Sequence, residues 1–132
     1  MVLLLFCICA DAWGADWRRY ADGNFATNYY DTESISRPSR DIVRVWGKRV
    51  WTEKGVIALE EKSGEKYRTI THSTFLSEFH CIDKKTRFLS GNNYFKDESV
   101  DGSVTYSTNN PSKWEFIIPE SVDEVLYIIL CE

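Results

Sequence analysis

The chain has 132 residues, of which 43% are hydrophobic and 27% are charged, and its formal net charge is −4. This length corresponds to one domain and excludes a TIM barrel or a two-domain dinucleotide-binding enzyme, and the composition excludes a disordered protein. The acidic balance argues against non-specific binding of nucleic acid, which calls for a basic surface.

The first fourteen residues are typical of a secretory signal peptide. Residues 2–9 are uniformly apolar (VLLLFCIC) and too short to span a bilayer as a helix. The small residues that follow predict cleavage after Ala12 or after Gly14, and the second site would start the mature chain at Ala15. No Lys or Arg precedes the apolar run, which leaves the true start codon open, and a buried first strand is the alternative interpretation. We therefore expect residues 1–14 to be removed and residues 15–132 to form one exported domain, periplasmic or at the cell surface.

Removal of the signal peptide would leave two of the four cysteines, Cys81 and Cys131. Two cysteines in an exported domain are most simply joined as one disulfide. No further segment is apolar and long enough to be a transmembrane helix, so we expect a protein that is soluble or peripheral to the envelope.

The rest of the chain is rich in aromatic and β-branched residues, which favour strands, and turn residues interrupt it at short intervals. In chain order, the sequence predicts a hairpin of residues 17–20 and 25–30, a loop at 36–39, a strand at 41–51, a short apolar stretch at 56–59, a long strand (or two with a bend) at 67–82, and a second hairpin of 86–95 and 103–108 joined by 96–102.

The C-terminal segment has the pattern of a helix. Ser121 followed by Glu124 is a capping box. Apolar residues then recur at helical spacing, at Val122, Val125, Leu126, Ile129 and Leu130. The predicted class is α+β, a single antiparallel sheet of about six strands with a C-terminal helix packed on it. Cys131 at the end of that helix would be tied to Cys81 in a strand.

Two basic clusters are candidate binding sites. Arg44, Trp46 and Lys48 alternate along the predicted strand 41–51 and would share one face of it. In an exported protein such a face suits a polyanion, which would be a glycan, lipopolysaccharide or an acidic patch on a partner protein. The alternative is an ordinary solvated strand with packed tryptophans. The second cluster follows Cys81 and consists of Lys84, Lys85 and Arg87.

The sequence predicts no catalytic residue, metal site or cofactor. G-x-S-x-G, Walker and dinucleotide-binding patterns are absent. Cys81 has a ready disulfide partner, which removes it as a nucleophile. His72 and His80 would stand roughly 26 Å apart on a straight strand, too far to share a metal. A small hydrolase is the least favoured of the functions that we consider.

An ordered set of residues resembles a known family. It runs through Tyr29-Tyr30-Asp31, Ser34-Ile35, Val43-Arg44-Val45-Trp46, Glu78-Phe79-His80-Cys81, Arg87-Phe88-Leu89-Ser90, Tyr94, Asp101-Gly102-Ser103-Val104, the segment 114–121 and Cys131. This set, from about Trp17 to Cys131, is similar to the surface-adhesin protein E family of Gram-negative bacteria. The resemblance implies a small antiparallel sheet with a disulfide-linked C-terminal helix, and adhesion through binding of host matrix and serum proteins.

The resemblance and the residues together favour a non-enzymatic exported domain that binds an unidentified protein, or a polyanionic component of the envelope or matrix, through its sheet surface. The alternative is a structural or accessory periplasmic protein without a host ligand. An exposed edge strand would also allow two copies to pair as a homodimer.

Overall fold

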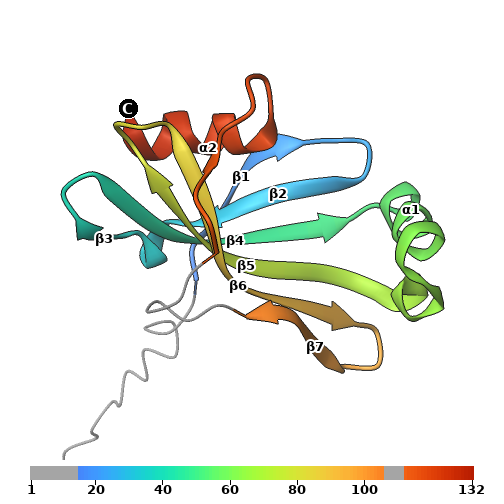
Figure 1. Ribbon diagram of the computed structural model, residues 1–132. Helices are drawn as coiled ribbons and strands as arrows, with labels where there is room; N and C mark the ends of the chain where they lie inside the picture. Colours follow the sequence, from blue (N-terminus) through green and yellow to red (C-terminus); the bar gives the residue numbers. More distant parts are fainter. Residues whose placement is uncertain (1–14, 106–111) are drawn as a thin grey trace, which may run out of the picture.

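The computed structural model describes residues 15–105 and 112–132 (Figure 1). The predicted signal peptide lies outside the described residues, as do residues 106–108 of the predicted second hairpin. The strands are β1 (Trp17–Asp22), β2 (Ala26–Asp31), β3 (Ser36–Ser39), β4 (Ile42–Trp51), β5 (Ile70–His80), β6 (Lys85–Phe95), β7 (Val100–Thr105) and β8 (Glu115–Phe116), and the helices are α1 (Glu53–Ser63) and α2 (Val122–Cys131).

The described strands form one eight-stranded antiparallel sheet, as the α+β prediction requires. Six of them follow each other in the order β1-β2-β4-β5-β6-β7, while the short strands β3 and β8 pair with β4 and β6. These two short strands account for the difference from the predicted number. The first hairpin is confirmed as β1 and β2, and the predicted strand at 67–82 is one continuous strand of 11 residues, β5, although residues 67–69 belong to a 3-10 helix before it.

Two predicted boundaries are wrong. Residues 36–39 are not a loop but the short strand β3, in which Ser36 pairs with Arg44 and Ser39 with Ile42. Pro38 lies between these two paired positions, as a residue without an N–H can in a short outer strand. The second hairpin turns earlier than predicted, and β7 begins at Val100 because Asp97 closes the turn by accepting from the backbone N–H of Ser99 at 3.0 Å.

Helix α1 is absent from the sequence prediction, which found only a short apolar stretch at 56–59. Thr52 caps the helix by accepting the backbone N–H of Gly55 at 3.1 Å, and Gly64 ends it with a φ of 112°. Gly55 lies against the backbone carbonyl of Phe25, so the helix begins in contact with the first hairpin. Figure 1 shows α1 beyond the ends of β4 and β5.

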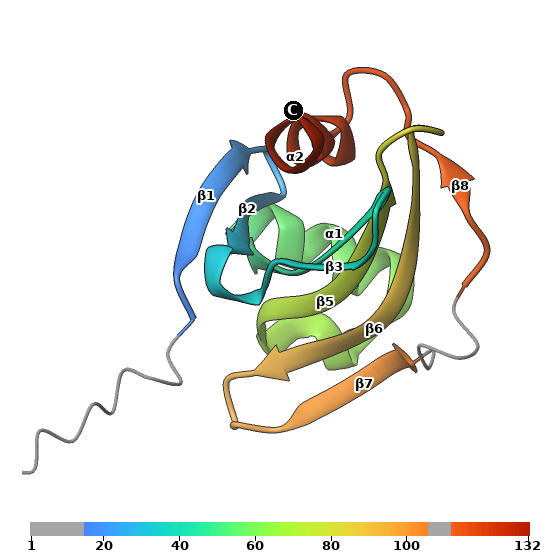
Figure 2. The same ribbon diagram turned by 90° about the vertical axis from the view of Figure 1, so that its left-hand side faces the viewer.

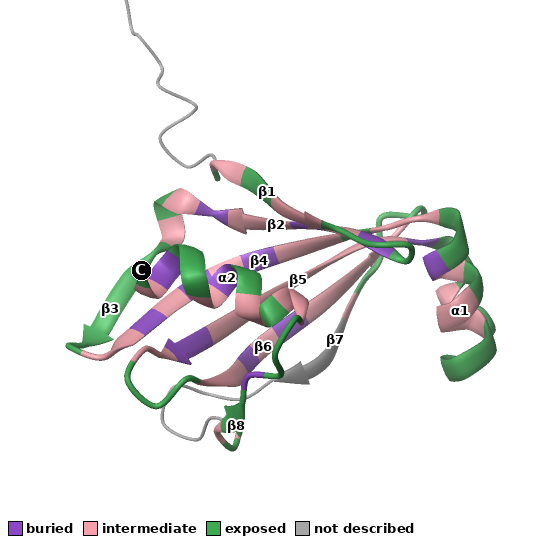
Figure 3. Ribbon diagram, turned by 90° about the horizontal axis from the view of Figure 1, so that it is seen from above, coloured by how far each residue is buried: buried purple, intermediate pink, exposed green. Residues whose placement is uncertain are grey.

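Helix α2 is confirmed and completes the core. Ser121 Oγ accepts the backbone N–H of Glu124 at 3.2 Å, as the capping box predicts. The helix lies on one face of the sheet (Figures 2 and 3), which we call the inner face. The fully or nearly buried core side chains are Val43, Val45, Phe79, Ile117, Leu126 and Leu130. Each side chain of this kind contributes about 1.5–3 kcal/mol when buried, so the core holds α2 to the sheet.

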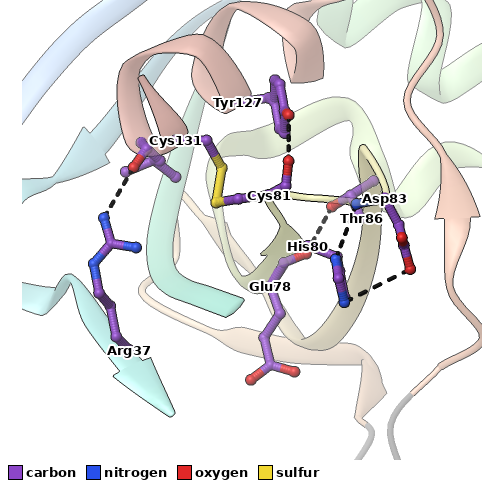
Figure 4. Close-up of a disulfide and its surroundings, with 9 residues drawn as sticks. Arg37, Glu78, His80, Cys81, Asp83, Thr86, Tyr127 and Cys131 are labelled. Carbon is purple, nitrogen blue, oxygen red and sulfur yellow. Dashed lines mark hydrogen bonds and ion pairs between the residues drawn. A yellow bond between two sulfur atoms is a disulfide. The ribbon is translucent and has the colours of Figure 1, made fainter. Parts of the chain in front are cut away.

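The predicted disulfide joins Cys81, next to the end of β5, to Cys131 at the end of α2 (Figure 4). The hydroxyl of Tyr127 donates to the carbonyl of Cys81 at 2.6 Å. Arg37 of β3 donates to the carbonyl of Leu130 at 3.2 Å. The last turn of α2 is therefore attached to the sheet by one covalent bond and two hydrogen bonds.

Candidate binding surface

The face of the sheet opposite α2, which we call the outer face, carries most of the candidate residues. Along β4, Val43 and Val45 point to the inner face and are almost completely buried. Arg44, Trp46 and Lys48 alternate with them and therefore lie together on the outer face. Helix α2 lies on the other side of the sheet and α1 lies at its end, so neither helix covers this group (Figures 1 and 2).

At the centre of the outer face, two arginines share one carboxylate. Arg44, Glu78 and Arg87 are direct neighbours across β4, β5 and β6. Glu78 is 1% exposed. Its Oε2 accepts from Arg44 Nε at 2.9 Å, and its Oε1 accepts from Arg87 Nε at 2.8 Å. The second nitrogens of both guanidinium groups lie within 2.8 Å of the same oxygens. Two positive charges on one negative charge leave this cluster with an excess positive charge.

Trp114, just before β8, covers one end of this cluster. The guanidinium carbon of Arg87 lies 4.1 Å from the centroid of the Trp114 ring, a close cation–π contact. His80 meets the same ring edge-on, with the centroids 5.7 Å apart. Trp114 therefore packs on the charged cluster from the outer face.

Lys48 of the outer face lies close to two aromatic rings. Its Nζ lies 5.0 Å from the ring centroid of Trp17 and 5.7 Å from that of Tyr29. Within residues 15–105 and 112–132, no carboxylate side chain lies within salt-bridge distance of it. Its charge is therefore available to an incoming anion.

His72 and Tyr94 continue the aromatic surface next to Lys48. Their rings stack with centroids 4.4 Å apart and planes 6° apart. Partial burial lowers the pKa of His72, and the charge of Lys48 lowers it further. A neutral, stacked imidazole beside a lysine gives this part of the outer face both flat apolar area and positive charge.

The second basic cluster is divided between two environments. Lys85 and Arg87 alternate along β6 and lie on the outer face, where Lys85 Nζ is 4.6 Å from the ring centroid of Phe116. Lys84 occupies the β5–β6 turn with a φ of 54° and pairs instead with Glu124 of α2 at 3.1 Å. The structure thus brings two of the three residues to the first cluster. Ligand binding by any of these residues stays a prediction.

Sequence reasoning does not identify the partners of these residues. Glu78 enters the sequence analysis only within a family pattern, and Trp17, Tyr29 and Trp114 only as hydrophobic residues of strands or patterns. The available signal is the two-residue periodicity, which assigns each residue to a face but does not say which strands are neighbours.

Within the described residues, no helix is long and apolar enough to cross a membrane. No curated protein and no solved structure matches the chain. The model of one protein family, described as surface-adhesin protein E, matches residues 17–132, nearly the whole chain. This match confirms the resemblance seen in the sequence, and the chain belongs to the surface-adhesin protein E family.

Proposed function

We propose that the protein is an exported, adhesin-like binding domain whose outer face binds a polyanionic component of the matrix or envelope, or an acidic patch on a partner protein. Membership of the surface-adhesin protein E family supports an adhesin-like, non-enzymatic role at the level of class. The polyanion, the face that binds it and export through residues 1–14 are our own inferences.

The observation that carries the proposal is positive charge gathered on an uncovered sheet face. The cluster of Arg44, Glu78 and Arg87 has one positive charge in excess, and Lys48 and Lys85 flank it without a carboxylate partner in the described part of the chain. This local excess contrasts with the formal net charge of −4 for the whole chain. A locally basic face on an acidic protein attracts polyanions to that face and in one orientation.

Lys48 and Lys85 are the residues to test, because Arg44 and Arg87 hold the buried Glu78 and their loss would disturb the fold. We expect Lys48→Glu and Lys85→Glu each to elute from a heparin column at lower salt than the wild-type protein. Exposed Lys62 near the end of α1 is the matched control, since Lys62→Glu changes the net charge equally far from the outer face. Equal elution of all three variants would show that net charge alone governs retention and would contradict the proposal.

We further infer that the protein pairs as a homodimer through the edge strand β7. The sheet ends on β1 and β7. The edge strand β1 carries the exposed Arg18 and Arg19, which pair with Asp16 and Asp22, and charges of this kind discourage strand addition. Val100 at the start of β7 is 56% exposed. Light scattering after gel filtration should then give twice the monomer mass at high concentration, and Val100→Lys should shift it to the monomer. A monomer at every concentration would contradict this inference.

A further inference from the structure

The inner face of the sheet has a cavity that α2 leaves uncovered. Helix α2 packs over Val43, Val45 and Phe79, at one end of the central strands. Next to it lies a cavity of about 650 Å³, a volume that suits a small organic ligand. Six of its lining residues matter here: Arg49, Trp51, Ser73, Phe75, Asn93 and Asp123.

Arg49 is one of three cationic residues that line this cavity, with Arg87 and Lys113. Its Nε donates to Oδ1 of the buried Asn28 at 3.2 Å, and its guanidinium carbon lies 5.5 Å and 5.4 Å from the ring centroids of Trp51 and Phe75. These contacts hold the guanidinium between two rings. In the described part of the chain, no carboxylate lies within salt-bridge distance of it. The two terminal nitrogens of Arg49 therefore keep donors for an external acceptor.

Asn93 provides a second donor through a short hydrogen-bonded chain. Trp51 Nε1 donates to Ser73 Oγ at 3.0 Å, and Ser73 Oγ donates to Asn93 Oδ1 at 2.6 Å. An indole N–H can only donate, so the single hydroxyl hydrogen of Ser73 goes to the oxygen of Asn93. The amide nitrogen of Asn93 has no acceptor among the described residues. Both Arg49 and Asn93 thus offer hydrogen-bond donors, which favours a ligand with hydrogen-bond acceptors.

We propose that this cavity binds a small organic carboxylate. The carboxylate would accept from the terminal nitrogens of Arg49 and from the amide nitrogen of Asn93, while the apolar part of the ligand lies against the rings of Trp51 and Phe75. Charge-assisted hydrogen bonds from a guanidinium are the stronger kind, and the two rings add apolar contact area for the ligand. The cavity lies on the opposite face from Lys48 and shares only Arg87 with the residues described for the proposed polyanion surface, so a substitution at Lys48 distinguishes the two sites.

The negative charge of Asp123 should weaken the binding of a carboxylate. Substitutions can therefore be designed that either raise or lower the affinity. Asp123 belongs to the first turn of α2 and lines the same cavity. Desolvation by the surrounding protein raises the pKa of this carboxyl although the residue is exposed, and the charge of Arg49 partly offsets that effect. Its negative charge would repel a carboxylate, so Asp123→Asn should strengthen binding, whereas Arg49→Gln should weaken it.

Phenylacetate is a suitable probe, with phenylacetamide as its uncharged counterpart. In ¹⁵N-labelled wild-type protein, phenylacetate should shift the Trp51 indole and Arg49 Nε signals, and phenylacetamide should bind at least about tenfold more weakly. Arg49→Gln should lower the affinity for phenylacetate by a similar factor, and Asp123→Asn should raise it. Lys48→Glu on the outer face should leave it unchanged, whatever its effect on heparin binding.

The proposal is overturned if phenylacetate and phenylacetamide bind equally, or if neither shifts the Trp51 and Arg49 signals. Arg49 also donates a hydrogen bond to Asn28, so its loss could disturb the fold. The phenylacetate affinity of Arg49→Gln is therefore compared with that of the wild-type protein only after the spectrum of the variant shows a native fold. Asp123 is exposed, so Asp123→Asn should keep the fold, and it decides the matter alone if the first variant fails to fold. Unchanged or weaker phenylacetate binding by Asp123→Asn would overturn the proposal.

Discussion

Arg44 and Glu78 face each other across β4 and β5, and two nitrogens of Arg44 contact a single carboxylate oxygen of Glu78, Nε at 2.9 Å and Nη2 at 2.8 Å. The other oxygen is left for Arg87, so the carboxylate is saturated from both sides. A carboxylate that is 1% exposed would be unstable in this sheet without both partners. The same pairing gives the outer face its rigid centre and its surplus positive charge.

We expect Glu78→Gln to destabilise the protein by about 2–3 kcal/mol. The substitution keeps the size of the side chain but leaves two guanidinium groups without a counter-charge. The loss should fall below the ~3–5 kcal/mol of a fully buried pair, because the Arg44 and Arg87 side chains are 28% and 20% exposed. Urea unfolding followed by circular dichroism measures this change.

Glu60→Gln is the control for Glu78→Gln. Glu60 pairs with Arg68 at 2.7 Å, but the Arg68 side chain is 63% exposed, so this loss should stay below about 1 kcal/mol. Equal effects of the two substitutions would show that the cluster around Glu78 has no special role in stability.

Cys131→Ser should lower the free energy of unfolding by up to about 4 kcal/mol. The bond to Cys81 closes a loop with a sequence separation of 50, and a loop of this length loses much chain entropy in the unfolded state when it is cross-linked. The double variant with Cys81→Ser should be as stable as the single one, because each removes the same bond. An unchanged denaturation midpoint under oxidising conditions would contradict a stabilising disulfide.

The two helices show why one was predictable and the other was not. The five apolar positions of α2 and its cap at Ser121 form a complete local pattern, and both are found in the structure. In α1 the apolar stretch covers only 56–59, and the signals that define the helix are Thr52 before it and Gly64 after it. Thr52 and Gly64 are visible in the sequence, but a short apolar stretch between glycines is compatible with a strand as well as with a helix.

On the outer face, the sequence predicts which side of a strand a residue occupies but not its partners on the neighbouring strands. Alternation along β4 places Arg44, Trp46 and Lys48 on one face whatever strands lie beside it. The role of Arg44 depends on Glu78, which is 34 positions away and is brought opposite by the register of β5. Register is a property of the assembled sheet, and a one-residue shift would reverse the face of every side chain. The cavity around Arg49 was not predicted for the same reason, because its lining comes from four strands, the segment before β8 and α2.

Gly55→Ala should destabilise the protein although alanine is the better helix former. In an open helix the exchange would stabilise by about 0.5–1 kcal/mol. Here the added Cβ would collide with the backbone carbonyl of Phe25, which cannot rotate away as a side chain could. Gly23→Ala is the matched control, since its Cβ would meet its nearest atom, the Ala26 carbonyl oxygen, at an ordinary 3.5 Å. Thermal unfolding of both variants checks the prediction, and a gain in stability for Gly55→Ala would show that α1 does not dock on the hairpin.

The stability of the protein should fall on mild acidification through His72. Partial burial and the nearby charge of Lys48 lower its pKa from the ordinary 6.5, so the folded state binds a proton less readily than the unfolded state. The stabilisation is therefore complete above pH 6.5 and is lost as the pH falls towards the lowered pKa. His72→Gln should reduce the decrease in urea midpoint between pH 7.5 and pH 5.5, whereas Tyr94→Phe, which keeps the stacked ring, should retain it. If His72→Gln and the wild-type protein lose stability equally over this range, the pH dependence comes from other groups and not from the burial of His72 beside Lys48.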